Sequence, residues 1–474
     1  MGKNKDKIKV EFLGNNAIDV TGSAILITTD NNKQILLECG MIQNCDSTND
    51  FKLNSKPFAF KAKNIDYVII CHQHQDHIGL IPKLLHDGFK GKIIATEIAS
   101  KFFKPMWKDS CKIIEYDSRI LSKQRKKTVL PYYDETDVYN ALDLTYEYDY
   151  NKIYDLDENI SFKFLKNSHI LGAAQVELYI KDNMGVQKTI LYTSDLGSFK
   201  VKNHYVENND KSSKANIVIS ECTYGKRTQE SAPNREKDLE KLKTKIKEVC
   251  IDNKGRLLIP VFALSRSQEI LTNLYKMYKD DSDFNIPIYV DSPLIITLNK
   301  VYCNVLKGED LELFKKVCDW QNVHFIESVE ESNACIKDKR PKIVLSSSGF
   351  LTNGRSCSYL KEYIQNEKDC VISVGYSPNN SVFGKIKNGE PIIKIDKKNY
   401  KNKCTCMSLY SFSSHVPRHE LLSYLKSIYT EKYYLVHGEE SGKLEFKENL
   451  EEELSKMCRT SQVVSTTKNT ICYL

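Results

Sequence analysis

Three histidines and one aspartate share a stretch of six residues, 72–77, that reads HQHQDH. The whole chain of 474 residues holds only ten histidines, so this concentration is unusual. In an extended segment His72 and His74 point to the same side, and a following turn can aim Asp76 and His77 at a second point nearby. Imidazole and carboxylate groups are typical zinc ligands. The spacing predicts two adjacent metals, an arrangement that recurs in phosphoester hydrolysis.

The element that must position this stretch is an apolar run at 67–71, which we expect to be a buried strand. A glycine, Gly79, and a helix-like segment at 81–89 follow. Polar residues clustered where a strand ends commonly line a functional site. A lone histidine is more often structural, but the HxHxDH pattern at the end of a buried strand favours a metal site.

The rest of the chain alternates strands and helices. Short strand-like runs separated by turns dominate the first 200 residues, and a polar, turn-rich crossover follows at 204–216. From 217 onward, strand-like runs alternate with amphipathic helices such as 235–250, which predicts a parallel α/β sheet. Near 395 a third segment begins, with strand-like stretches at 404–412 and 432–438.

Length and composition set wider bounds. A chain of this size is expected to form two or three domains. No apolar run approaches the roughly 18 residues of a membrane span, and the N-terminus has no signal-peptide pattern. We therefore expect a cytoplasmic protein that does not associate with a membrane. The 15 cysteines should be mostly reduced and none is needed as a ligand.

A net charge of +7 is compatible with a polyanionic partner. A basic run at 123–127 is interpreted as a solvated surface.

The HQHQDH stretch resembles the signature of the metallo-β-lactamase fold, and the remaining motifs resemble its β-CASP branch of nucleic-acid-processing nucleases. The similarity extends over nearly the whole chain. Its motifs are LGNNAIDVTGS (13–23), LLECGM (36–41), NSHILGAAQVEL (167–178), YTSDLGS (192–198), ECTYGKR (221–227), IPVFALSRSQE (259–269), YVDSPL (289–294), VLSSSGFLTNGR (344–355), FSSH (412–415) and LVHGE (435–439).

This resemblance implies an α/β architecture with one split domain. A four-layer αββα metallo-β-lactamase domain would comprise residues 1–208 and 394–474. An α/β β-CASP cap domain, residues 209–393, would be inserted between its two parts.

The resemblance also implies two Zn²⁺ ions and the side chains around them. One zinc would be held by His72, His74 and His169, the other by Asp76, His77 and His437, with Asp195 bridging. Asp76 would also orient the attacking hydroxide, and Glu221 with His415 would protonate the leaving oxygen. Hydroxyl and guanidinium donors for substrate phosphates would be Arg266, Ser346, Ser347 and Arg355.

Several positions depart from the family pattern. Glu38 stands where aspartate is usual, Ser265 where glycine is usual, and Pro417 where aspartate is usual. The text KRTQE (226–230) replaces a frequent histidine, and Ser358-Tyr359 replaces a histidine pair. These departures affect the expected register of the substrate rather than the class of reaction.

Within the family, a histidine at the position of His437 is typical of members that act on RNA. The layout resembles bacterial and archaeal relatives of the nuclease subunit in the mRNA 3′-end cleavage complex. We therefore expect a zinc-dependent endoribonuclease that hydrolyses single-stranded RNA. The alternatives are a 5′-exoribonuclease of the RNase J type, a non-catalytic RNA-binding scaffold and a small-molecule hydrolase. The sequence does not decide whether the protein forms a homodimer.

Overall fold

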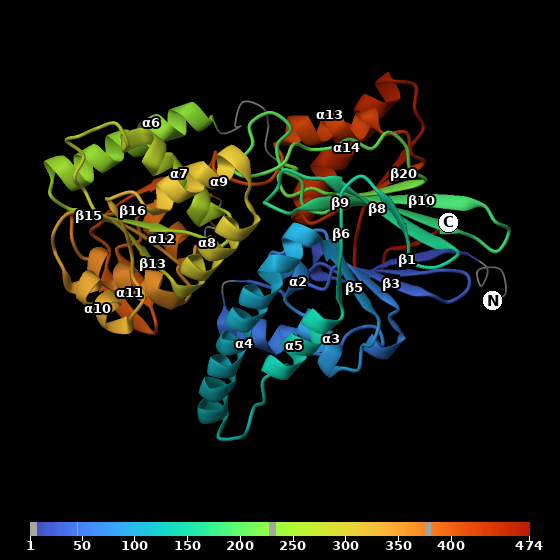
Figure 1. Cartoon of the computed structure of the whole chain (residues 1–474), viewed down its shortest axis with the longest axis horizontal. Helices are drawn as coiled ribbons and strands as arrows, with labels where there is room; N and C mark the ends of the chain where they lie inside the picture. Colours follow the sequence, from blue (N-terminus) through green and yellow to red (C-terminus); the bar gives the residue numbers. More distant parts are fainter. Residues whose placement is uncertain (1–6, 45, 227–233, 376, 378–380) are drawn as a thin grey trace. The chain divides into compact units, whose positions relative to one another are not determined.

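A computed structural model describes residues 7–44, 46–226, 234–375, 377 and 381–474. The chain divides into two compact units (Figure 1). The first comprises Met1–Ser231 and Ser414–Leu474, and the second comprises Ala232–Ser413. Residues 227–230 of the KRTQE segment, and with them Arg227 of the motif at 221–227, lie outside the described residues.

The first unit contains two seven-stranded sheets. The order in one is β22 (Ile471–Tyr473), β1 (Lys9–Phe12), β2 (Ile25–Thr28), β3 (Gln34–Leu37), β4 (Tyr67–Ile69), β5 (Lys92–Thr96) and β6 (Thr145–Tyr148). The order in the other is β21 (Gln462–Ser465), β20 (Lys432–Val436), β11 (Ile217–Glu221), β10 (Gln187–Tyr192), β9 (Ala174–Lys181), β8 (Ile160–Lys166) and β7 (Ile153–Asp155).

The two sheets pack face to face, because one buried cluster draws side chains from both, among them Ile27 and Leu37 from the first and Phe162 and Val176 from the second. Strand β8 shows why: its buried and half-buried residues alternate, which places one row of side chains in this core. Strand β11 is buried on both sides, as expected of a strand covered by a sheet and by helices.

Helices cover the outer faces of both sheets (Figure 1). On the second sheet they bury a further cluster that includes Leu425 and Leu450. The helices of this unit are α1 (Ser47–Asn54), α2 (Gln75–Ile78), α3 (Ile81–His86), α4 (Glu97–Arg125), α5 (Glu135–Asp143), α13 (Arg418–Ser427) and α14 (Glu440–Lys456), with 3₁₀ turns η1 (Asn15–Ala17) and η2 (Ala62–Asn64). The predicted αββα layering is confirmed.

The second unit is built on a parallel six-stranded sheet. Its order is β14 (Val323–Phe325), β13 (Ile288–Asp291), β15 (Lys342–Ser346), β12 (Arg256–Pro260), β16 (Cys370–Ser373) and β19 (Thr405–Ser408), with a separate hairpin of β17 (Ile392–Ile395) and β18 (Lys398–Lys401). Its helices are α6 (Arg235–Ile246), which continues into the π-helical η3 (Lys247–Asp252), α7 (Arg266–Tyr278), α8 (Pro293–Val305), α9 (Gly308–Cys318), α10 (Val329–Lys337), α11 (Gly354–Tyr363) and α12 (Val382–Lys387).

Three strands, β11, β18 and β19, lie in a different unit from the one that the expected domain boundaries assign. We expected the inserted domain to begin at 209, but β11 pairs in parallel with β10 and β20 of the first unit. We expected the first domain to resume at 394, but β19 pairs with β16 of the second unit. Backbone pairing over long sequence separations decides both cases.

The structure also bears on the expectations about membrane-spanning helices and about the cysteines. In the described part of the chain, no helix combines the length and apolar character needed to cross a membrane. The cysteines outside position 45, which is not described, are all free thiols, and most of them are buried.

Candidate metal centre

The predicted metal ligands lie in loops that follow strand ends. His72 follows β4, His169 follows β8, Asp195 follows β10 and His437 directly follows β20. Strands β8, β10 and β20 run in the same direction, since β8 and β10 are both antiparallel to β9, and β11 joins β10 and β20 in parallel. Their carboxyl ends therefore meet at one edge of the sheet.

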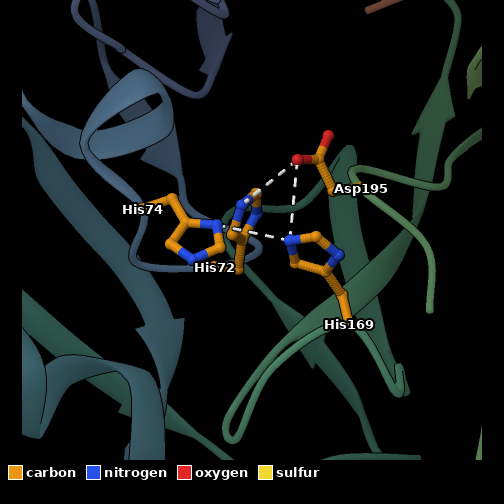
Figure 2. A group of neighbouring side chains, drawn as sticks. All are labelled: His72, His74, His169 and Asp195. Atoms are coloured by element: carbon orange, nitrogen blue, oxygen red, sulfur yellow. Dashed lines mark hydrogen bonds and ion pairs between the residues drawn. The ribbon is translucent and has the colours of Figure 1, made fainter. Parts of the chain in front are cut away.

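The structure brings His72, His74, His169 and Asp195 into one group, whose candidate ligand atoms lie within 4.8 Å of one another (Figure 2). The Oδ2 atom of Asp195 is 3.6 Å from Nε2 of His72 and 3.7 Å from Nε2 of His169. The Nε2 atom of His169 is also 3.3 Å from Nδ1 of His74. Figure 2 shows the three imidazoles and the carboxylate facing a common point.

A second group contains Asp76, His77, His437 and again Asp195. The Nε2 atom of His437 is 3.4 Å from Oδ2 of Asp76, and Nδ1 of the same ring is 3.4 Å from Oδ1 of Asp195. The Nε2 atom of His77 is 3.4 Å from Oδ2 of Asp195. Asp195 is thus common to both groups, as the resemblance implied.

These side chains fit a pair of divalent cations. Most of them are buried, and within the described residues Nε2 of His72 and Oδ1 of Asp195 have no hydrogen-bond partner. A buried polar atom without a partner costs free energy, which a bound cation would remove. The donor set of imidazoles and carboxylates is the one that zinc prefers.

The protonation states also suit metal binding. Burial and the nearby His77 hold the pKa of His72 well below its ordinary value, and burial does the same for His169, so both rings are neutral ligands. Burial alone would raise the pKa of Asp195, but the His437 and His77 imidazoles hold it well below its ordinary value. Burial would lower the pKa of His77, but Asp195 and Asp76 raise it, so a metal bound there must displace a proton.

Two side chains brace the histidines from behind. Glu38, buried and in a left-handed conformation (φ 61°), accepts hydrogen bonds from the Cys71 backbone N–H (3.1 Å) and the Ser194 hydroxyl (3.2 Å). Its Oε1 lies 3.5 Å from Nδ1 of His77, so the glutamate carboxylate contacts this ring from the side away from Asp195 and Asp76, which face Nε2. The Ser194 hydroxyl also lies 3.1 Å from Nδ1 of His72, which fixes the orientation of that ring.

The backbone of the 72–77 loop rests on the segment around Gly40. A Cβ atom at Gly40 would lie 1.6 Å from the Asp76 carbonyl oxygen, so no larger residue fits there. The flanking Cys39 N–H donates to the His77 carbonyl (2.8 Å) and the Ser23 N–H donates to the Asp76 carbonyl (2.9 Å). These contacts give the LLECGM motif its structural role.

Other supporting residues carried no signal of their own in the sequence. Asn167 donates to the Asp195 carbonyl (2.6 Å) and accepts from the His169 N–H (3.0 Å), so one amide ties two ligand loops together. His437, at a φ of 50°, donates its backbone N–H to Asn16 (2.7 Å), and its Nδ1 lies 3.0 Å from the Thr223 hydroxyl. Asn167, Asn16 and Thr223 all lie inside the quoted motifs, but only the folded geometry reveals their roles.

Glu221 and His415, the predicted acid pair, lie in contact beside the metal ligands. Nδ1 of His415 is 3.1 Å from Oε2 of Glu221, which also accepts a hydrogen bond from the Thr223 N–H (3.3 Å). Glu221 is buried and Oε1 accepts from the Leu196 N–H (2.5 Å). Burial would lower the pKa of His415, but the Glu221 carboxylate outweighs it and raises this pKa to about 9. The pair can therefore hold a proton near neutral pH.

The four predicted substrate contacts belong to the second unit, after the carboxyl ends of parallel strands. Arg266 begins α7, and Ser346 ends β15. Ser346 is fully buried and donates to the Asp291 carbonyl (2.7 Å), so its hydroxyl supports the strand end rather than a substrate. Ser347 shares a hydrogen bond with Ser292 (2.8 Å), and Arg355 forms an ion pair with the buried Asp291 carboxylate.

Two departures from the family pattern have consequences for the local structure. Ser265 has a φ of 67°, a conformation that favours glycine, so the serine is strained there. Pro417 precedes α13 with a φ of −64° and provides no side-chain cap.

Comparison with known proteins supports the family that the motifs indicated. Family models match residues 267–386 as a Beta-Casp domain, residues 401–461 as a Zn-dependent metallo-hydrolase RNA specificity domain, and residues 12–251 as the anti-Pycsar protein Apyc1. A crystal structure of a protein of unknown function from Enterococcus faecalis, 12% identical, covers 99% of this chain and all of its own with a TM-score of 0.51.

Curated relatives are similar over most of their length. Ribonuclease TTHA0252 of Thermus thermophilus is 29% identical over 90% of this chain and 92% of its own. The probable RNase MJ4 of Methanocaldococcus jannaschii is 31% identical with the same two coverages, and the transcription termination factor FttA of that organism is 28% identical over 94% of this chain and 69% of its own. The chain therefore belongs to the β-CASP family of metallo-β-lactamase-fold ribonucleases and is a metal-dependent hydrolase.

Proposed function

We propose that this protein is a zinc-dependent endoribonuclease that cleaves phosphodiester bonds of single-stranded RNA in RNA processing or decay. The observation that carries the proposal is the pair of four-residue groups that share Asp195. Two adjacent cation sites with one bridging carboxylate suit a reaction in which attacking and leaving oxygens both need stabilisation.

The first zinc would be held by His72, His74 and His169, and the second by Asp76, His77 and His437, with Asp195 between them. Zinc bound there supplies Lewis acidity, which brings the pKa of water toward neutrality and offsets negative charge on the reacting phosphate.

The chain's own residues would direct protons. Asp76, the least buried carboxylate of the groups at 15% side-chain exposure, would orient the attacking water through its carboxylate. His415 would donate a proton to the leaving oxygen from Nε2, because its Nδ1 faces Glu221. Glu221 keeps that imidazole charged and correctly turned.

Two findings support RNA as the substrate. The 401–461 segment matches a model named for RNA specificity, and two of the relatives are named as RNases. Arg355 would act on substrate phosphates through the guanidinium edge that Asp291 leaves open, and Arg266 and Ser347 remain candidate phosphate contacts. We propose that the protein is cytoplasmic. A homodimer is one assembly that it could form.

The test uses single-stranded RNA and DNA labelled at the 5′ end or the 3′ end, incubated with the zinc-loaded protein with and without a chelator. We expect internal RNA cuts visible from both labels, abolished by the chelator. His74→Ala or Asp76→Ala should remove cleavage with the fold intact, whereas His324→Ala, an exposed histidine outside the groups, should retain it.

The alternatives predict other outcomes. Release of single nucleotides from the 5′ end alone would indicate a 5′-exoribonuclease. RNA binding without cleavage by the zinc-loaded protein would indicate a scaffold. Hydrolysis of a lactam or thioester with none of RNA would indicate a small-molecule hydrolase.

A further inference from the structure

We propose that the first unit carries a second contact for single-stranded RNA, a pocket remote from the metal centre. This inference rests on the proposed function, because it assumes that RNA is the substrate. The pocket has a volume of about 590 Å³ and is lined by Phe58, Phe60, Lys61, Lys63, Lys83 and Leu130, among others. We call these six residues the aromatic–basic pocket.

The aromatic side of the pocket can stack on a base. The rings of Phe58 and Phe60 are themselves stacked, with centroids 5.0 Å apart and an angle of 17°. The Phe58 and Phe60 side chains are half-buried, and Leu130, which lines the same pocket, is 73% exposed. Stacking of bases on aromatic rings is a common, sequence-tolerant way to hold single strands.

The charged side of the pocket suits a polyanion. Three lysines and one aspartate, Asp87, contribute the full charges of the lining. Lys83 neutralises Asp87 at 3.0 Å and places its ammonium 3.8 Å from the centre of the Phe58 ring. Lys61 and Lys63 are exposed, and the ion pairs found in the described part of the chain include neither of them. Their charges are thus available to phosphates.

A second group of positive charges adjoins the pocket. Helix α4 ends in the basic run at 123–127, whose four cationic side chains are all exposed. The Ser122 hydroxyl accepts from the Val129 N–H (2.8 Å) and closes this turn. Leu130 is three residues beyond Lys127, at most about 11 Å along the chain. The basic run, which the sequence presents only as a solvated surface, therefore extends the charge of the pocket.

The pocket lies at the other end of the strands from the metal ligands. Residues 61–64 directly precede β4, whereas His72 follows it. Helix α3 runs from the ligand loop to Asp87. A few residues later the Lys92 N–H donates to the carbonyl of Asp66 (3.0 Å), which lies just before β4. The stretch from Tyr67 to His72 alone spans about 17 Å. One nucleotide cannot touch both sites, so the pocket would hold a distant part of a longer strand.

Single-stranded RNA fits these features better than an apolar peptide does. A peptide groove would gain little from two uncompensated lysines and an adjoining run of four cations. A polyanion with flat bases uses both the charge and the rings. The pocket would therefore add affinity for long RNA without changing the chemical step.

The test measures binding to the full-length protein in a chelator, so that it does not depend on catalysis. Fluorescence anisotropy would follow a labelled RNA of about 30 nucleotides and one of about 6. The double variant Lys61→Glu/Lys63→Glu should weaken binding of the long RNA on the order of tenfold at 0.1 M salt and reduce the salt slope by about 1.4. The variant Phe60→Leu, which keeps apolar packing but loses the ring, should weaken it about fivefold.

The matched control is Lys181→Glu/Lys468→Glu, which makes the same charge change at two exposed lysines outside the pocket. It should bind long RNA at least five times more tightly than the pocket variant. Cleavage of the short RNA should be the same in all variants. Equal weakening by control and pocket variants, or photo-crosslinks of thiouridine RNA that avoid residues 55–63 and 130–132, would overturn the proposal. Absence of cleavage with intact, pocket-dependent binding would instead refute only the nuclease function.

Discussion

Replacing Glu221 by glutamine tests whether this carboxylate keeps His415 protonated. The substitution preserves the shape of the side chain but removes its charge 3.1 Å from Nδ1 of His415. Burial disfavours the charged imidazole, and in the variant no carboxylate offsets this effect. The pKa of His415 should therefore fall from about 9 to its ordinary 6.5 or lower. A group that must donate a proton is active below its pKa, so activity is lost as the pH rises through that value.

The size of the effect follows from the two pKa values. At pH 8 a group with a pKa of about 9 is about 90% protonated, whereas one with a pKa of 6.5 is about 3% protonated. Glu221→Gln should therefore lower kcat at pH 8 by at least about 30-fold, and the loss should shrink as the pH falls. Zinc bound at the two sites would lower the pKa of His415 in both proteins, so the separation between the alkaline limbs of the two pH–rate profiles is the quantity to compare.

The assay is a pH–rate profile of RNA cleavage, with metal content measured on the same samples because Glu221 also binds the backbone next to Asp195. The variant Glu221→Asp, which keeps the charge, should shift the alkaline limb less. Adding Glu221→Gln to His415→Ala should cause little further loss. An alkaline limb that stays in place in Glu221→Gln, with both metals retained, would refute the assigned roles.

Three further substitutions probe the support of the fold and the site. Ser265→Gly should raise the free energy of unfolding by about 1 kcal/mol in urea titrations, because it relieves a φ of 67°. Arg256→Ala should lower it by about 3–5 kcal/mol in the same titration, because Asp369 would be left buried without its partner. Ser194→Ala should weaken zinc binding about tenfold or more in a chelator competition, because the His72 ring loses its hydrogen bond.

Only the first part of the candidate site could be predicted from residue types and spacing, and the later members came from the resemblance to the β-CASP family. The run 72–77 combines scarce histidines with the end of an apolar strand, and the later members stand at the ends of other strands. The structure places the other six predicted ligands in two groups that share Asp195. The alternation of strands and turns indicated mixed α/β structure, whereas the αββα layering was implied by the family resemblance.

The remaining features depend on contacts that a sequence read locally does not contain. The strand at 217–221 is as apolar as a cap strand would be, and only its pairing with β10 and β20 assigns it to the first unit. Asn167 and Ser194 are ordinary polar residues until the fold places them against ligand loops. Ser346 looked available to substrate, but its hydroxyl is used within the second unit.

The metal content of the purified, zinc-equilibrated protein is the most direct test of the account. Elemental analysis should find about two zinc ions per chain, about one in His437→Ala, and fewer than one in Asp195→Asn, because only Asp195 belongs to both ligand groups. Zinc below one equivalent in the unaltered protein, or two equivalents retained by Asp195→Asn, would contradict it.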